Sequence, residues 1–297
     1  MTVNTRYRHL LHCLNLAALL LWSSAAPARV GDERQLMQDI ASQRLPDTYQ
    51  TLLVGDREVV MVEYPARTPI TRGLAVLITE AGGVPQDDHQ LARLARQLTH
   101  YGWHTLTMAA PPLGDPQILL TLPPATDAAP QAAPEQEAEA ALHGRADLLH
   151  SPVQHLQAQQ YALQQQMLQL EDRRAEVAGF YLIIAQGTTA ASLARLYTEQ
   201  AIPQPDGLVS LGAFLPERNL NKALPEMFAQ LQPALLDVYS AWDNRWTLST
   251  TDARRVAATR GLKLHYRQQE LVGQPRDEQQ TLRLAKMIYG WLTYMGW

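Results

Sequence analysis

One stretch constrains the fold of this chain more than any other: an apolar run, a polar turn and an amphipathic segment follow one another in residues 180–197. The run Phe180–Ile184 has the length and the β-branched content of a strand that is buried on both faces. After the turn, apolar residues recur at helical spacing, among them Leu193, Ala194 and Tyr197. The stretch therefore predicts a strand, a tight turn and a helix.

Strand-like and helix-like segments alternate through the chain from residue 49 onward. Two β-rich runs, Tyr49–Val54 and Glu58–Tyr64, stand on either side of Gly55-Asp56, an order that predicts a hairpin. The continuous apolar run Gly73–Thr79 predicts a central strand. This alternation predicts an α/β fold: a doubly wound, mostly parallel sheet with helices on both faces, in one domain spanning residues 49–297. Later strands are expected at 103–108, 206–211, 233–239 and 262–266.

Residues 113–151 differ in composition from the segments on either side. They are rich in proline and alanine, place Glu135, Glu137 and Glu139 at alternating positions, and lack a sustained apolar period. This composition predicts disorder, and a loop of this length in a compact domain is either a flexible insertion or a lid over a site. We interpret the segment as a flexible insertion and keep the lid as the alternative.

The first 28 residues predict a secretory signal peptide. Arg6 and Arg8 form a basic head, an apolar run follows, and Ala26-Pro-Ala28 supplies small residues for cleavage. A permanent membrane anchor needs about 20 clean apolar residues, whereas this run is shorter and is broken by polar residues. We therefore expect cleavage, a periplasmic or secreted protein, and no stable membrane span in the mature chain. Residues 29–48 form a leading segment to which we assign no function.

Cysteine and charge exclude several classes of protein. Cys13 is the only cysteine and lies inside the predicted signal, so the mature chain has no thiol for disulfides, nucleophilic catalysis or metal binding. Loss of Arg6 and Arg8 lowers the number of basic residues from 25 to 23 against 29 acidic ones, a formal charge of −6. No basic stripe for nucleic acid is present in the sequence.

The sequence carries no motif for a cofactor or metal. Gly82-Gly83 lacks the third glycine and the distant acidic residue of a dinucleotide fingerprint, and no phosphate-binding loop motif occurs. His100 and His104 are four apart, but Gly102-Trp103 interrupts the helix that would align them. We therefore expect no cofactor and no metal.

With these segments in order, residues 49–297 resemble an α/β-hydrolase domain. More narrowly, the chain resembles a family of exported bacterial α/β-hydrolase-like proteins known as domain of unknown function thirty-five thirty. The motifs that carry the resemblance are His89, Tyr101-Gly-Trp103, Ala185-Gln-Gly-Thr188, Trp242-Asp243 and Ile288-Tyr-Gly-Trp-Leu292.

The resemblance implies a catalytic triad of which most is absent. In α/β-hydrolases the turn after the central strand has the pattern G-x-S-x-G and presents a nucleophilic serine. Aligned on that turn, Gly187 takes the nucleophile's place, Asp243 the place of the acid, and Gln274 the place of the histidine. Gly82-Gly83 takes the place of the loop that supplies an oxyanion-hole amide. Only the acid of the triad is retained, and the triad works as a unit.

Four other side chains near the expected site could substitute for the missing groups. Thr188 carries a hydroxyl, but threonine at this place, like Thr189 beside it, is also the ordinary cap of a helix expected to begin near Ala190. His89 and Glu80 bracket the glycine loop and could face the site or simply be solvated. His265 is expected inside the strand at 262–266, where a structural role is the plainer interpretation.

Three functions follow as hypotheses. The first is a non-catalytic periplasmic protein that uses the old active-site cleft to bind a small molecule or an envelope protein. The second is an exported hydrolase of esters or amides with a non-standard site built from Thr188, Asp243 and His89 or His265. The third is an envelope interaction protein whose acidic insertion makes the contact. The missing nucleophile and histidine favour the first over the second.

Overall fold

The computed structural model describes residues 49–55, 57–83, 90–113, 152–274 and 278–297. The predicted signal peptide, the leading segment and His89 lie outside these ranges, as does the predicted insertion except for Leu113. No helix in the described ranges is long and apolar enough to cross a bilayer.

Eight strands of the described residues form one sheet in the order β1-β2-β4-β3-β5-β6-β7-β8. Strand β2 pairs antiparallel with β1 on one side and with β4 on the other. The remaining strands, in the order β4, β3, β5, β6, β7 and β8, run parallel to one another. The predicted hairpin and the mostly parallel sheet are thereby confirmed. The strands are β1 (Tyr49–Val54), β2 (Arg57–Tyr64), β3 (Gly73–Ala81), β4 (Trp103–Ala110), β5 (Phe180–Gln186), β6 (Gly207–Leu211), β7 (Ala234–Tyr239) and β8 (Tyr266–Glu270).

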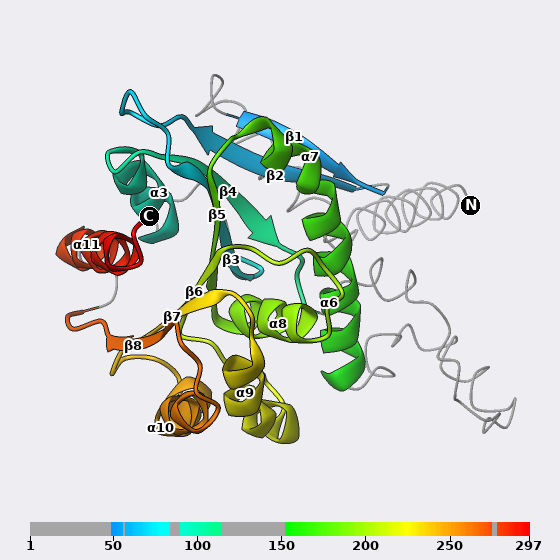
Figure 1. Cartoon of the computed structure of the whole chain (residues 1–297). Helices are drawn as coiled ribbons and strands as arrows, with labels where there is room; N and C mark the ends of the chain where they lie inside the picture. The colour runs from blue at the N-terminus through cyan, green and yellow to red at the C-terminus, as the bar shows by residue number, and fades with distance from the viewer. Residues whose placement is uncertain (1–48, 56, 84–89, 114–151, 275–277) are drawn as a thin grey trace, which may run out of the picture. The chain divides into compact units, whose positions relative to one another are not determined.

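Helices cover both faces of the sheet, as predicted (Figure 1). Alternate residues of β3 enter the two cores: Val76 and Ile78 pack with α6, α8 and α9, while Ala75 and Leu77 pack with α3 and α11. The helices are α3 (Gln90–Thr99), α6 (Pro152–Gln169), α7 (Glu171–Glu176), α8 (Gly187–Thr198), α9 (Arg218–Gln230), α10 (Arg245–Arg260) and α11 (Glu278–Tyr294).

The register of β3 against β5 decides which residues meet at the carboxyl edge of the sheet. The paired residues run in parallel from Gly73 beside Phe180 to Ile78 beside Ala185. The carboxyl ends of these parallel strands therefore lie level, and the predicted strand–turn–helix of residues 180–197 is confirmed as β5 and α8.

The prediction of a strand at 262–266 is wrong, and so is the prediction that His265 lies inside a strand. Helix α10 extends to Arg260, Leu262 has a φ of +51°, and β8 begins only at Tyr266. Leu262 and Leu264 are 82% and 90% exposed. In the sequence these leucines alternate with polar residues, which is the pattern of a half-buried strand. The edge strand β8 is polar instead, and its backbone pairing with β7 requires no apolar side chains.

A buried ion pair ties α10 and β8 to β7. Arg254 Nε donates to Asp237 Oδ2 at 2.9 Å, and neither side chain is exposed to solvent. Tyr266 and Gln268 of β8 donate to the same oxygen at 3.0 and 2.9 Å. Arg254 Nη1 also donates to the backbone oxygen of Ala213, which follows β6, at 3.1 Å. One charged pair thus connects three neighbouring strands with the helix that covers them.

We predict that Arg254→Met lowers the free energy of unfolding by about 3–5 kcal/mol, because it leaves the Asp237 carboxylate buried without its charged partner. Chemical denaturation with urea measures the change. Arg255→Met is the matched control, since Arg255 is 64% exposed and its partner among the described residues is the exposed Asp252, so its effect stays within about 0.5 kcal/mol. Equal effects of the two substitutions would contradict the importance of the buried pair.

Candidate functional site

A pocket of about 220 Å³ lies at the carboxyl edge of the sheet. The ends of β3, β5, β6 and β7 form its walls together with the first turn of α8 and residues of α11. This is the edge at which open α/β sheets bind ligands. Its lining residues are Glu80, Gln90, Gln186, Gly187, Leu211, Gly212, Phe214, Val238, Tyr239, Ser240, Asp243, Asn244, Leu271, Gln280 and Leu284.

Gly187 forms the turn from β5 into α8. Its φ is +53°, in the left-handed region that favours glycine. A methyl group built on Gly187 would lie 2.5 Å from Glu80 Cδ and 2.6 and 2.9 Å from the two oxygens of that carboxylate. The space into which a nucleophilic side chain at position 187 would extend is therefore filled by Glu80.

Glu80 reaches this place from the end of β3. Its carboxylate lies beside Gly187 and close enough to the backbone N–H of Thr188, in the first turn of α8, for that N–H to affect its pKa. Burial of the carboxylate raises the pKa of Glu80, the bond from Thr188 lowers it, and the negative charge of Asp243 raises it. The side chain as a whole is nevertheless exposed, so one side of it stays open to solvent.

Asp243 is the second carboxylate of the pocket. Its Oδ2 accepts the backbone N–H of Ser240 at 2.8 Å, which fixes the carboxylate just after β7. Burial raises the pKa of Asp243, while Ser240 and Arg254 lower it and Asp237 raises it. The residue predicted to be the acid thus lies in the same pocket as Gly187, the residue at the nucleophile's place.

The glycine loop after β3 closes on itself. The backbone N–H of Gly83 donates to Glu80 O at 2.8 Å, and Gly82 between them has a φ of +77°. Thr79 Oγ1 donates to Gly83 O at 3.2 Å. The amide of Gly83, which the sequence suggested for an oxyanion hole, is therefore engaged in this turn, and neither glycine lines the pocket.

The prediction that Thr188 and Thr189 cap helix α8 is wrong. The helix begins at Gly187, so both threonines lie in its first turn and the N-cap residue is Gln186, whose side chain makes no capping bond. Both hydroxyls are buried and have no hydrogen-bond partner in the described part of the chain. Thr188 contributes its backbone N–H to the site, not its hydroxyl.

Two other predicted site residues are not brought into the pocket. His265 precedes β8 and its backbone oxygen accepts from Leu235, at the beginning of β7, so it lies at the amino edge of the sheet. Gln274 follows β8 with an exposed side chain and does not line the pocket.

The described pocket has acidic groups but no catalytic base of the hydrolase type. No histidine is among its described lining residues, and the described ranges hold no cluster of three or more histidine, cysteine or acidic residues that could bind a metal ion. Two neighbouring carboxylates can exchange protons or attract a positively charged group. They do not reproduce a serine activated by a histidine.

Sequence reasoning named Glu80 only as a residue that could face the site and missed several others. Gln186 is the last residue of β5 and Phe214 lies three residues after β6, so the rule that ligands bind at the carboxyl ends of parallel strands could have suggested them. Gln280 lies on α11, and no local signal in the sequence shows that this helix reaches the pocket.

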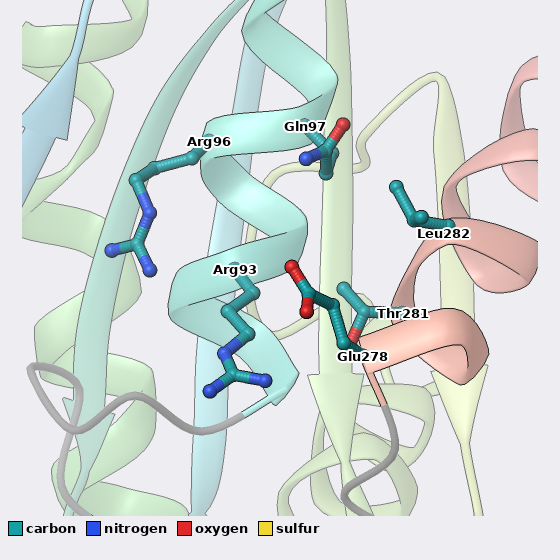
Figure 2. Close-up of a pocket in the computed structure, with 6 residues that line it drawn as sticks. All are labelled: Arg93, Arg96, Gln97, Glu278, Thr281 and Leu282. Carbon is teal, nitrogen blue, oxygen red and sulfur yellow. The ribbon is translucent and has the colours of Figure 1, made fainter.

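A second pocket, of about 300 Å³, lies between α3 and α11 (Figure 2). Arg93 and Arg96 line it from α3, and Glu278 from α11. Figure 2 shows that Arg96 extends to the side of α3 that faces away from α11, where its guanidinium lies 6.0 Å from the ring centre of Tyr64. The two arginines therefore do not converge on one anion, and the pocket at the carboxyl edge is the better candidate site.

The sequence matches the family described as protein of unknown function, DUF3530, over residues 22–294. The chain belongs to this family. The resemblance found from the motifs is confirmed. No curated protein matches the sequence.

Three solved structures with TM-scores above 0.5 are similar to this chain. A dienelactone hydrolase from Anabaena variabilis is 11% identical, with a TM-score of 0.52 over 83% of this chain and 96% of that one. Est1E from Butyrivibrio proteoclasticus is 7% identical, with a TM-score of 0.53 over 83% of this chain and 100% of that one. The esterase domain of a Rhodothermus marinus protein is 11% identical, with a TM-score of 0.51 over 82% and 96%. At these identities the likeness shows the α/β-hydrolase fold.

We predict that Gly187→Ala lowers the free energy of unfolding by about 1–3 kcal/mol, because alanine is strained at a φ of +53° and its methyl group displaces Glu80. In a Glu80→Ala background only the backbone strain remains, so the two changes should couple by about 0.5 kcal/mol or more. Urea denaturation of the four proteins in this cycle measures the coupling.

Gly290→Ala is the matched control, since a methyl group on Gly290, inside α11, meets open space. That change should be neutral or stabilising by up to about 1 kcal/mol. Strict additivity of Gly187→Ala and Glu80→Ala would show that the two residues do not share the space described above.

Proposed function

We propose that this protein is a periplasmic, non-catalytic member of the α/β-hydrolase fold that uses the pocket at the carboxyl edge of its sheet to bind a small molecule or an envelope protein. The observation that carries the proposal is the Glu80 carboxylate, which fills the space that a nucleophilic side chain at position 187 would need and lies near the backbone N–H of Thr188. In an active serine hydrolase that amide stabilises the oxyanion of the reaction.

Three further features support the proposal. Gly187 has no side chain to act as nucleophile, and the described lining contains no histidine to act as base. Asp243 accepts a backbone N–H of its own loop, at Ser240, and no histidine is among the described residues that line the pocket with it. A triad acid without its histidine cannot orient a base, and the members of a triad contribute little when others are missing.

We predict that the purified mature protein lacks serine-hydrolase activity of ordinary strength. Binding and amides alone give roughly 10³ to 10⁴ over water in a dissected serine protease, below the roughly 10⁶ or more typical of enzymes. The measurement is a screen of short-chain and long-chain acyl esters and amides, together with labelling by a fluorophosphonate probe. Gly187→Ser should gain neither turnover nor labelling, because the described lining of the pocket offers no histidine to activate the new hydroxyl.

The second hypothesis, an exported esterase or amidase with a non-standard site, has one observation in its favour. Glu80 and Asp243 share a pocket and both have a raised pKa, the combination found in acid–base catalysis. Strong parental turnover that collapses in Glu80→Gln, Asp243→Asn or Thr188→Ala would establish this alternative. The control is Asp252→Asn, which removes a carboxylate that is 92% exposed on α10.

We further predict export with cleavage near Ala28. After cell fractionation, intact-mass analysis should find the protein in the periplasm or the medium, shortened by about 28 residues. Leu19→Arg, which places a charge in the apolar run of the signal, should hold the full-length chain in the cytosol. Full-length parental protein in the cytosol would contradict the proposed location.

A further inference from the structure

The most exposed apolar side chains of the described residues lie at one edge of the sheet. Four large apolar side chains there are at least 80% exposed, whereas every other one in the described ranges is at most 66% exposed. The four are Ile70, Leu262, Leu264 and Tyr294. Exposed apolar groups that gather on one part of a protein surface are typical of a contact with a partner or a membrane.

All four belong to the amino edge of the sheet, opposite the pocket. Ile70 precedes β3, and the two leucines lie between α10 and β8. Tyr294 is at the end of α11, three residues before Trp297, whose ring stacks on Phe180 at the beginning of β5 with 4.6 Å between the ring centres. The surface is therefore separate from the candidate site.

The two leucines belong to a firmly held turn, residues 261–265, which we call the leucine turn. At the end of α10 the Lys263 N–H donates to Ala258 O at 3.0 Å, and Lys263 Nζ donates to Pro233 O at 2.9 Å. Leu262 has a φ of +51°, in the left-handed region that a bulky side chain enters only at a cost. The chain thus bears backbone strain at a side chain that packs in neither hydrophobic core.

The segment that carries the leucine turn is basic, although the chain has a formal charge of −4. Residues 253–269 contain five arginine or lysine residues, one histidine and no acidic residue. Arg254 is buried in its ion pair, but Arg260, His265 and Arg267 are exposed close to the leucines in the sequence. Apolar side chains that enter the headgroup region and cations that attract anionic lipids bind a protein to a membrane surface.

The charge distinguishes a bilayer from a second copy of the chain as the partner. In a symmetric dimer formed through the leucine turn, the exposed cations of one copy would face those of the other, which is unfavourable. The acidic residues that precede β6 at this edge are engaged within the protein: Glu199 pairs with Arg195 at 2.7 Å, and Asp206 accepts the Tyr181 N–H at 2.7 Å. An anionic bilayer is therefore the partner that the surface matches.

We propose that the amino edge of the sheet docks on an anionic lipid bilayer, with Leu262 and Leu264 inserted among the headgroups and Arg260 and Arg267 on the lipid phosphates. The leucines enter one leaflet without crossing the membrane. The pocket at the carboxyl edge then faces away from the bilayer. Because the two surfaces are separate, the contact does not depend on the function proposed above.

Flotation with lipid vesicles tests the contact. Protein without its predicted signal is mixed with vesicles of phosphatidylcholine alone, or of phosphatidylcholine and phosphatidylglycerol in equal parts. The parent should bind the vesicles that contain phosphatidylglycerol, and Leu262→Gln with Leu264→Gln should weaken this binding about tenfold or more, because two apolar side chains no longer enter the bilayer. The matched control is Leu53→Gln with Val272→Gln, which removes two exposed apolar side chains near the opposite edge and should bind as the parent does.

The charged part of the contact is tested by salt. Arg260→Gln with Arg267→Gln should lower the affinity for phosphatidylglycerol vesicles and make it less sensitive to added sodium chloride, because fewer charges meet the lipid. Arg218→Gln with Arg245→Gln makes the same change in net charge at the beginnings of α9 and α10, at the carboxyl edge. That control should keep the salt dependence of the parent.

Leu262→Asn separates loss of the contact from loss of the fold. Asparagine enters the left-handed region more readily than leucine, so the melting temperature should not fall although vesicle binding weakens. A parent that does not bind phosphatidylglycerol vesicles at low salt would overturn the proposal, as would equal binding by the double leucine variant. Dimerisation that the leucine substitutions abolish, without binding to vesicles, would assign the surface to a second copy of the chain instead.

Discussion

The geometry of the pocket depends on how closely β3 and β5 approach each other at their amino ends. Gly73 has a φ of +150°, and a methyl group there would lie 1.9 Å from Phe180 O. Phe180 N–H donates to Arg72 O at 2.9 Å. Only glycine permits this approach, which fixes the register of the two central strands. A slip of one residue would turn every buried side chain to the other face and would separate Glu80 from Gly187.

The pocket lies at the carboxyl edge of an α/β-hydrolase fold, but its charged groups differ from those of a serine hydrolase. A serine hydrolase presents a neutral hydroxyl beside an imidazole and offers free amides to a developing oxyanion. Here two carboxylates face one pocket, and one of them lies beside the first turn of α8. Asp243 is held by its own turn. Burial raises its pKa, while Ser240 and Arg254 lower it and Asp237 raises it. The scaffold that positions these groups is therefore intact, although the groups differ from those of a triad.

Local patterns in the sequence predicted the central part of the fold, because strands buried on both faces, such as Phe180–Ile184 and Gly73–Thr79, are long apolar runs. They failed at β8, where an edge strand is polar and two exposed leucines imitate a strand. The position of Asp243 in the pocket could be predicted from the order of the segments along the chain. The position of Glu80 beside Gly187 could not be predicted, because it depends on the pairing of two strands more than a hundred residues apart. Contacts of that kind have no signature in either segment alone.

The left-handed turn at Gly187 has a consequence for the stability of the whole domain. In α/β-hydrolases a serine is held at this turn in a strained conformation, and a non-glycine residue in the left-handed region costs about 1–3 kcal/mol. Glycine retains the shape of the turn without that strain. The free energy of unfolding is thereby higher by about as much as one or two ordinary mutations would lower it, which matters for a domain of marginal stability. A chain with glycine at this turn can tolerate destabilising changes elsewhere that the same chain with a strained serine there could not.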